Sequence, residues 1–398
     1  MITSSRAHRS LTPLLVLALW GACDNNDVVA YVDGLGPDAY CPTPGAPVRV
    51  DDGATELQCA GRIAERVFEH AICVCADLTT DRPLTVDGFD SSQGAYDPGA
   101  PTQLASTVAV NGDVQANDTV QISGDLIAAG ATGVSPGPNL TIAGALASNG
   151  ALEGADSRVE IGGDASVGGD ITLSEFTVNG VLTTPPEATV TVSGAEQINQ
   201  RATAAVAIAP PCPCAAEDRI DIAAIIAAQA QDNDNQSIEL DPSSLANFAT
   251  DTTLELPCGR FYLDRVQSDQ AALTLRVTGR AGLYVSAGIT LGRSLTVELA
   301  PQASLDLFVT DFVNVAGDLY LGDPDAPDRL RIYVDRAGAV NLSGRSVLAG
   351  NLYAPESTLS LPAGAEIFGA VFVDRIAASD TVSVHHDVAI QSAAAICP

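Results

Sequence analysis

Lysine is absent from this 398-residue sequence, because all 19 positions counted as lysine or arginine are arginine. Without lysine the chain has no Walker A loop, no Schiff-base nucleophile and no lysine that could hold a phosphate. The motifs H-E-x-x-H and G-x-G-x-x-G are missing too. The usual sequence signals of a zinc protease or a dinucleotide-binding enzyme are therefore lacking.

Aromatic residues are scarce, at 5% of the chain, and the single tryptophan, Trp20, lies in the N-terminal segment. Clefts that bind glycans are usually lined with aromatic rings. The composition therefore favours a non-enzymatic protein. A polysaccharide-acting lyase or hydrolase is the alternative, since scattered aspartates could supply a pair of carboxylates.

Positive charge is also in short supply, with 49 acidic residues and a formal net charge of −30. Binding to nucleic acid depends mainly on neutralising phosphates, so this charge excludes DNA and RNA as expected partners. It also disfavours direct contact with anionic membrane surfaces.

The N-terminus has the pattern of an export signal. Arg6 and Arg9 precede the apolar run "LTPLLVLALW", which is too short to span a bilayer. Gly21, Ala22 and Cys23 follow, and they resemble the lipobox of bacterial lipoproteins. This resemblance implies lipidation of Cys23 and attachment to the outer membrane or cell surface through the lipid. The alternative is an ordinary cleaved signal and a periplasmic or secreted protein.

The remaining cysteines are even in number, which in an exported chain predicts up to four disulfides. Cys73 and Cys75 lie two apart on a predicted strand, so each could connect that strand to a different neighbour. A four-thiolate zinc site formed with Cys212 and Cys214 is the competing interpretation, but no metal or other cofactor is predicted. The candidate half-cystines are Cys41, Cys59, Cys73, Cys75, Cys212, Cys214, Cys258 and Cys397.

Changes in pattern divide the chain into segments. Three- and four-residue apolar spacings predict a helix that begins near Leu57, and Asp218 is expected to cap a second helix. The predicted segments are a lipoprotein signal peptide (1–23), an acidic tether (24–53), a helix with a C-x-C capping segment (54–103), first repeats (104–196), a helical insert (197–253) and a second repeat domain (254–398).

Short copies of an apolar-x-apolar-x-Gly pattern recur through the first repeat segment. Alternation places one row of side chains inward, and glycine permits a sharp corner. Because one such strand cannot bury its apolar row, copies must stack, which predicts a mostly β fold, a right-handed β-helix or solenoid. A β-sandwich is the alternative. The six glycines are Gly112, Gly124, Gly144, Gly163, Gly180 and Gly194.

The string "LAGNLYAPESTLSLPAGAEIFGAVFVDRI", followed by "VSVHHDVAI", resembles the C-terminal β-helical domain of a group of uncharacterised secreted bacterial proteins, often lipoproteins. The shared pattern is a G-x-LYAP step followed by a closing H-x-D. The earlier repeats resemble bactofilin-like polymer-forming solenoids. These resemblances imply an architecture and carry no established activity.

Two kinds of polar cluster remain. A hydrogen bond between His385 and Asp387 is expected to close the last turn, because those two side chains share one face of a strand. Asp232, Asp234 and Asp241, and separately Asp323, Asp325 and Asp328, could bind calcium, although neither cluster completes an EF-hand loop. No catalytic residue is predicted.

The sequence as a whole favours a non-enzymatic structural, adhesion or assembly protein of the cell envelope. Expected partners are the membrane, through the N-terminal lipid, and a second copy or a cell-surface molecule. Self-association through an uncapped terminal turn is one way in which such a solenoid could assemble.

Overall fold

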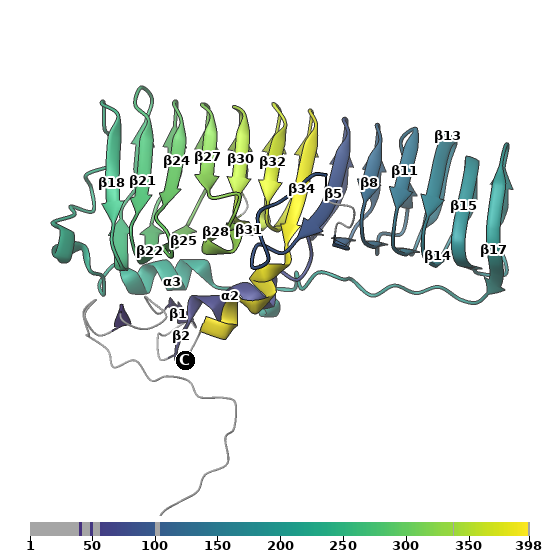
Figure 1. Ribbon diagram of the computed structural model, residues 1–398, viewed down its shortest axis with the longest axis horizontal. Coiled ribbons are helices and arrows are strands. Elements are labelled where there is room, and N and C mark those ends of the chain that lie inside the picture. The colour runs from purple at the N-terminus through teal and green to yellow at the C-terminus, as the bar shows by residue number, and fades with distance from the viewer. Residues whose placement is uncertain (1–39, 42–47, 51–55, 100–103, 337, 397–398) are drawn as a thin grey trace, which may run out of the picture.

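The chain folds into a parallel β-solenoid of about 13 turns, with few helices. The computed structural model describes residues 40–41, 48–50, 56–99, 104–336 and 338–396 (Figure 1). Strands of successive turns pair in parallel along the whole column, so the predicted solenoid is confirmed and the alternative of two facing antiparallel sheets is wrong.

Three sheets form the walls of the column. Along its axis, sheet A contains β18 (Thr252–Leu256), β21 (Leu273–Val277), β24 (Leu295–Leu299), β27 (Leu319–Gly322), β30 (Ser346–Ala349), β32 (Ala365–Phe368), β34 (Val382–Asp387), β5 (Leu84–Phe89), β8 (Val120–Ile122), β11 (Asn139–Ile142) and parts of β13 (Ala151–Ile161), β15 (Ile171–Thr184) and β17 (Glu196–Thr203).

Sheet B contains β19 (Gly259–Leu263), β22 (Arg280–Val285), β25 (Ser304–Val309), β28 (Leu330–Val334), the first parts of β31 (Asn351–Leu361) and β33 (Val371–Ala378), then β3 (Ile72–Val74), β6 (Val108–Val110), β9 (Leu126–Ala128), β12 (Leu146–Ser148), β14 (Ala165–Val167) and the ends of β15 and β17.

Sheet C contains β20 (Val266–Ser268), β23 (Ile289–Leu291), β26 (Val313–Val315), β29 (Ala339–Leu342), the second parts of β31 and β33, β4 (Leu78–Thr80), β7 (Val114–Ala116), β10 (Gly133–Ser135), the first parts of β13 and β15, and β16 (Val190–Val192).

The remaining elements lie outside these walls. They are the antiparallel pair β1 (Val48–Val50) and β2 (Glu56–Gln58), the helices α2 (Ala60–Val67) and α3 (Ile222–Gln229), and the 3-10 helices η1 (Ala216–Asp218), η2 (Asn235–Ile238), η3 (Pro327–Arg329) and η4 (Val388–Ile396).

The order of turns in space differs from their order in the chain. The N-terminal half of the column, residues 72–203, starts in the middle and runs to one end, and the C-terminal half, residues 252–387, runs from the other end back to the middle (Figure 1). There β33 pairs with β3 and β4, and β34 pairs with β5. The C-x-C segment expected to cap the column therefore forms an internal turn.

Corner glycines allow successive turns to stack closely. The amide of Gly144 donates to the carbonyl of Gly124 at 2.9 Å, and the amide of Gly163 donates to that of Gly144 at 2.7 Å. A Cβ on Gly144 would lie 2.7 Å from the Gly124 carbonyl carbon, so a side chain does not fit. Gly112 and Gly194 bond to Gly130 and Ser174 instead, which places them at other corners. The six copies in the sequence are thus not one per turn.

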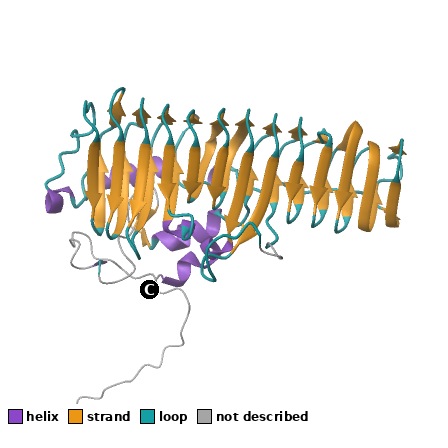
Figure 2. Cartoon of the chain, turned by 45° about the horizontal axis from the view of Figure 1, so that its top comes forward, coloured by secondary structure: helices purple, strands orange, loops and turns teal. Residues whose placement is uncertain are grey.

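Helices cover sheet B in the C-terminal half of the column, and the other two sheets lack helical cover over most of their length (Figure 2). The outward side chains of sheet B in the C-terminal half form an aromatic ladder, in which Tyr284, Phe308 and Tyr333 stack with centroids 5.1 and 4.6 Å apart. Buried residues of α2, α3 and η4 pack on this ladder. Asp221 caps α3 by accepting from the amide of Ala224, so the helix starts three residues later than a cap at Asp218 would place it.

Candidate functional site

Three disulfides connect distant parts of the chain. They join Cys41 to Cys258, Cys73 to Cys212 and Cys75 to Cys214, with Cα atoms 5.7 to 5.8 Å apart. Cys59 is disulfide-bonded as well. Cys23 and Cys397 lie outside the described residues. Structural disulfides indicate an oxidising compartment outside the cytoplasm.

The two C-x-C motifs bind one another rather than two different neighbours. Cys73 of β3 and Cys75, which directly follows β3, both pair with the segment that contains Cys212 and Cys214. All four sulfur atoms are thus brought together, as the zinc interpretation required, but as two disulfides. No group of metal-binding side chains is found among the residues that the structure describes.

This segment belongs to the return segment, residues 204–215, which runs back along the column from β17 towards α3 (Figure 1). Two asparagine side chains hold its backbone. Asn111 donates to the Cys212 carbonyl and accepts from the Cys212 amide, both at 2.9 Å. Asn149 makes the same two bonds with Ile208, at 2.8 and 2.5 Å.

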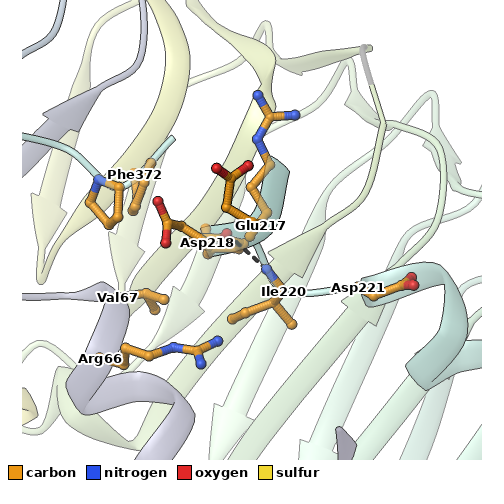
Figure 3. Close-up of a pocket in the computed structure, with 10 residues that line it drawn as sticks. Arg66, Val67, Glu217, Asp218, Ile220, Asp221 and Phe372 are labelled. Carbon is orange, nitrogen blue, oxygen red and sulfur yellow. Dashed lines mark hydrogen bonds between the residues drawn. The ribbon is translucent and has the colours of Figure 1, made fainter. Parts of the chain in front are cut away.

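A cavity of about 380 Å³ opens where the return segment passes α2 (Figure 3). Val67, Ile220 and Phe372 form its apolar part. Arg66 lines one side and Glu217 and Asp218 line the other. The lining residues include no serine, cysteine or histidine, so the cavity offers charge and shape without a nucleophile–base pair.

Three polar contacts fix the wall of this cavity. Arg219 donates to the Cys214 carbonyl at 2.8 Å and forms an ion pair with Glu356. The Tyr353 hydroxyl accepts from the Ile220 amide at 3.2 Å, and burial raises the pKa of that hydroxyl. Arg66 has no ion pair with any residue in the described ranges. It is therefore the cation in this cavity that a ligand could reach.

A second hollow of about 390 Å³ lies on sheet C of the N-terminal half, lined in part by Asp77, Asp113 and Glu153. Two of these carboxylates have structural partners. Asp77 accepts from Arg375 at 2.9 Å, and Asp113 accepts from the Gly133 amide at 2.9 Å. Glu153 is exposed.

The strand that ends the C-terminal half carries His385, which is bonded to a residue of the N-terminal half. His385 Nδ1 lies 2.7 Å from an oxygen of Asp87, and the Tyr96 hydroxyl donates to the other oxygen at 2.8 Å. The Tyr96 ring also packs on the His385 ring, with centroids 4.0 Å apart. The expected bond between His385 and Asp387 is wrong, because parallel pairing of β34 with β5 sets Asp87 directly beside His385.

Asp387 instead fastens the loop after β5, accepting from the amide and hydroxyl of Ser91 at 2.9 and 2.6 Å. Next to it, His386 is 2% exposed. Its burial lowers the pKa of the imidazole to about 4, although a bond to the Phe68 backbone opposes the shift. Its Nε2 has no hydrogen-bond partner among the described residues. This histidine is therefore neutral near pH 7.

The acidic clusters have structural roles in the residues described. Asp234 accepts from the Arg260 amide at 2.7 Å and from the Tyr40 hydroxyl, and Asp232 pairs with the Arg260 guanidinium at 3.1 Å. In the other cluster, Asp323 accepts from the amide of Asp325 at 3.1 Å. Burial raises the pKa of Asp328, and nearby Asp387 adds to the shift.

No signal in the sequence pointed to Asp87, Tyr96 or the paired asparagines Asn111 and Asn149. Each forms its hydrogen bonds with a residue at least nine positions away in the chain, and the two asparagines bond to residues more than 50 positions away. The aromatic ladder was detectable in principle, because its members occupy the outward position of consecutive alternating strands.

Comparisons with known proteins extend to the C-terminal half. Neither a curated protein nor a solved structure matches the chain. Residues 215–393 match a family model described as Domain of unknown function (DUF7305), a range that contains α3, the C-terminal half of the column and most of η4. The C-terminal half of this chain is therefore similar to a domain whose function has not been established.

Proposed function

We propose that the chain is a lipid-anchored structural protein of the bacterial cell envelope, in which the solenoid acts as a rigid support for adhesion or assembly. The observation that carries this proposal is the pair of disulfides between the two C-x-C motifs, which fixes the return segment on the column. Solenoid stability adds up from contacts between neighbouring turns. A covalently fastened column of this kind suits a load-bearing role outside the cytoplasm.

Cys23 is the proposed attachment point. None of the described helices is long and apolar enough to cross a bilayer. A lipid on Cys23 would therefore account for membrane attachment, usually together with a second acyl chain because one chain binds only weakly.

The attachment is tested with a Cys23→Ser variant expressed with its own signal. Membrane fractionation should find the wild-type protein in the membrane and the variant in the soluble exported fraction. Mass spectrometry of the mature N-terminus should show a lipid on the wild-type cysteine. A variant that stays on the membrane would count against the anchor, whereas the disulfide-fastened column would be unaffected.

The second candidate function is action on polysaccharide, and the hollow with Asp77, Asp113 and Glu153 favours it. Paired carboxylates are the chemistry that glycosidases use. Two of the three are already bonded to protein groups, which weakens this candidate. Incubation with neutral and acidic polysaccharides should release no reducing ends. Release that Glu153→Gln abolishes would establish the enzyme instead.

A further inference from the structure

The two ends of the column are finished differently. At the end where the C-terminal half begins, Leu245 is 3% exposed, and Ile238, Leu240 and Phe248 pack against the core. Backbone bonds to Leu245 and Asp234 occupy the edges of β20 and β19. A segment of chain therefore covers the apolar core at this end and the edges of sheets B and C.

At the other end, β16 and β17 are the last strands, and β17 is exposed over almost its whole length. The register between β17 and β15 shows how this last turn differs from the turn before it. Glu196 pairs with Phe176 of the preceding turn, and Arg201 pairs with Leu182. Phe176 and Leu182 are 0% and 1% exposed. Two inward positions that are apolar core one turn earlier are therefore charged at the end.

These two charged side chains form an ion pair at the open end of the core. Arg201 Nη2 donates to Glu196 Oε1 at 2.7 Å, and the side chains are 49% and 38% exposed. Three other inward residues of the turn, Val190, Val192 and Ile198, remain apolar and pack on the core. The ion pair thus lies at the open end of an otherwise apolar column.

An unpaired edge strand is a template for another chain, and inward-pointing charge is one way in which proteins protect it. A second copy stacked on this end would bury two such ion pairs. Taking paired charges out of water often costs more than their mutual attraction returns. With Phe and Leu at these positions, as in the preceding turn, the same contact would bury apolar surface and be favourable.

We propose that residues 190–203 form a terminating turn, in which the Glu196–Arg201 ion pair prevents a second copy of this chain from stacking on the open end. The column is then a finite rod and does not grow into a filament. This inference goes beyond the proposed envelope function, because it concerns the free chain and holds with or without a lipid.

The test is the mass in solution of the full-length, oxidised chain with Cys23→Ser, measured by sedimentation velocity over a wide range of protein concentration. This protein should be monomeric throughout. The double variant E196F/R201L, which copies the preceding turn, should show twice that mass at micromolar concentration. Assembly should stop at two copies, because a segment of chain covers the apolar core at the opposite end.

A charge swap, E196R/R201E, is the matched control, since it keeps the ion pair and should stay monomeric. The single variant R201L leaves Glu196 unpaired and should also be monomeric. It provides a second measurement in case the double variant folds poorly. The proposal is overturned if the parent chain dimerises through this end, or if the folded double variant stays monomeric at every concentration.

Discussion

The N-terminal and C-terminal halves of the column have the same kind of inner surface and differ on the outside. In both halves the inward residues form one continuous apolar core. Some turns also differ in length. In the N-terminal half one turn leads from Val159 to its partner Phe176. In the C-terminal half a longer turn leads from Val313 to its partner Val340. The extra residues lie in loops outside the core, so the two halves share one inner column.

The outward row of sheet B explains why helices cover only one half. In the C-terminal half this row contains Tyr284, Phe308 and Tyr333, all fully buried. In the N-terminal half the corresponding row contains Ala109, Ile127 and Ala147. Large aromatic side chains require cover by the apolar surface of helices, whereas the smaller alanine and isoleucine side chains leave room for an extended segment. The size of one outward side chain per turn thus decides the outer layer.

The largest expected effect concerns the two disulfides that hold the return segment on the N-terminal half. Replacing all four of Cys73, Cys75, Cys212 and Cys214 by serine should lower the free energy of unfolding by about 5 kcal/mol, because each bond has a sequence separation of 139 residues. Replacing only Cys75 and Cys214 should cost about 1 kcal/mol or less, since the other bond still closes that loop. Guanidinium unfolding followed by circular dichroism measures the free energy of unfolding of both variants. Equal losses in the two would contradict the argument that the two disulfides close the same loop.

The next effect tests the outer layers directly. Phe308→Ala should cost about 4 kcal/mol, because it empties a buried site between two stacked rings. Ile127→Ala, at the matching outward position of the N-terminal half, should cost only about 1 kcal/mol, since Ile127 is half-buried. Thermal and chemical unfolding of both variants would settle this, and similar losses would mean that the outer layers do not differ in their contribution.

Acidification should weaken the junction between the halves. The pKa of His386 is about 4 in the folded chain, below its ordinary value of 6.5. The unfolded chain therefore binds more protons between these values, and stability falls as pH drops from 6.5 towards 4. The full difference between these two pKa values corresponds to about 3 kcal/mol in the free energy of unfolding.

His386→Gln should flatten this part of the stability curve relative to the wild type. Unfolding midpoints between pH 4 and 7 provide the measurement. His70, whose pKa burial also lowers, stays in both proteins, so only the difference between them is informative. Parallel curves would show that His386 does not titrate as its burial implies.

The smallest effect distinguishes two hydroxyls on sheet B, that of Tyr284 in the aromatic ladder and that of Tyr353, which pairs with the last ladder residue, Tyr333. The Tyr284 hydroxyl is buried without a hydrogen-bond partner in the described ranges, so Tyr284→Phe should be neutral or slightly stabilising. Tyr353→Phe should cost about 1 kcal/mol, because the Ile220 amide loses its acceptor. Melting temperatures of the two variants check this, and the opposite order would contradict the bonding described.

Part of this architecture could be predicted from the sequence because it depends on local periodicity. Alternating apolar residues with glycines predicted stacked strands, and the even number of cysteines other than Cys23 predicted disulfides. Lipidation of Cys23 stays a prediction. Pairing partners were not predictable: Cys73 could not be assigned to Cys212, nor His385 to Asp87, because these contacts span 139 and 298 residues.

The sequence by itself determined that short strands must stack into a column with an apolar interior, since no single strand can bury its own apolar row. Only the tertiary structure decided the order of the turns. Parallel strands with similar inward residues can pair in many orders, so local pattern does not choose among them. In this chain the choice depends on long-range contacts, in which β34 meets β5 and two C-x-C motifs meet each other, so that the column begins in its own middle.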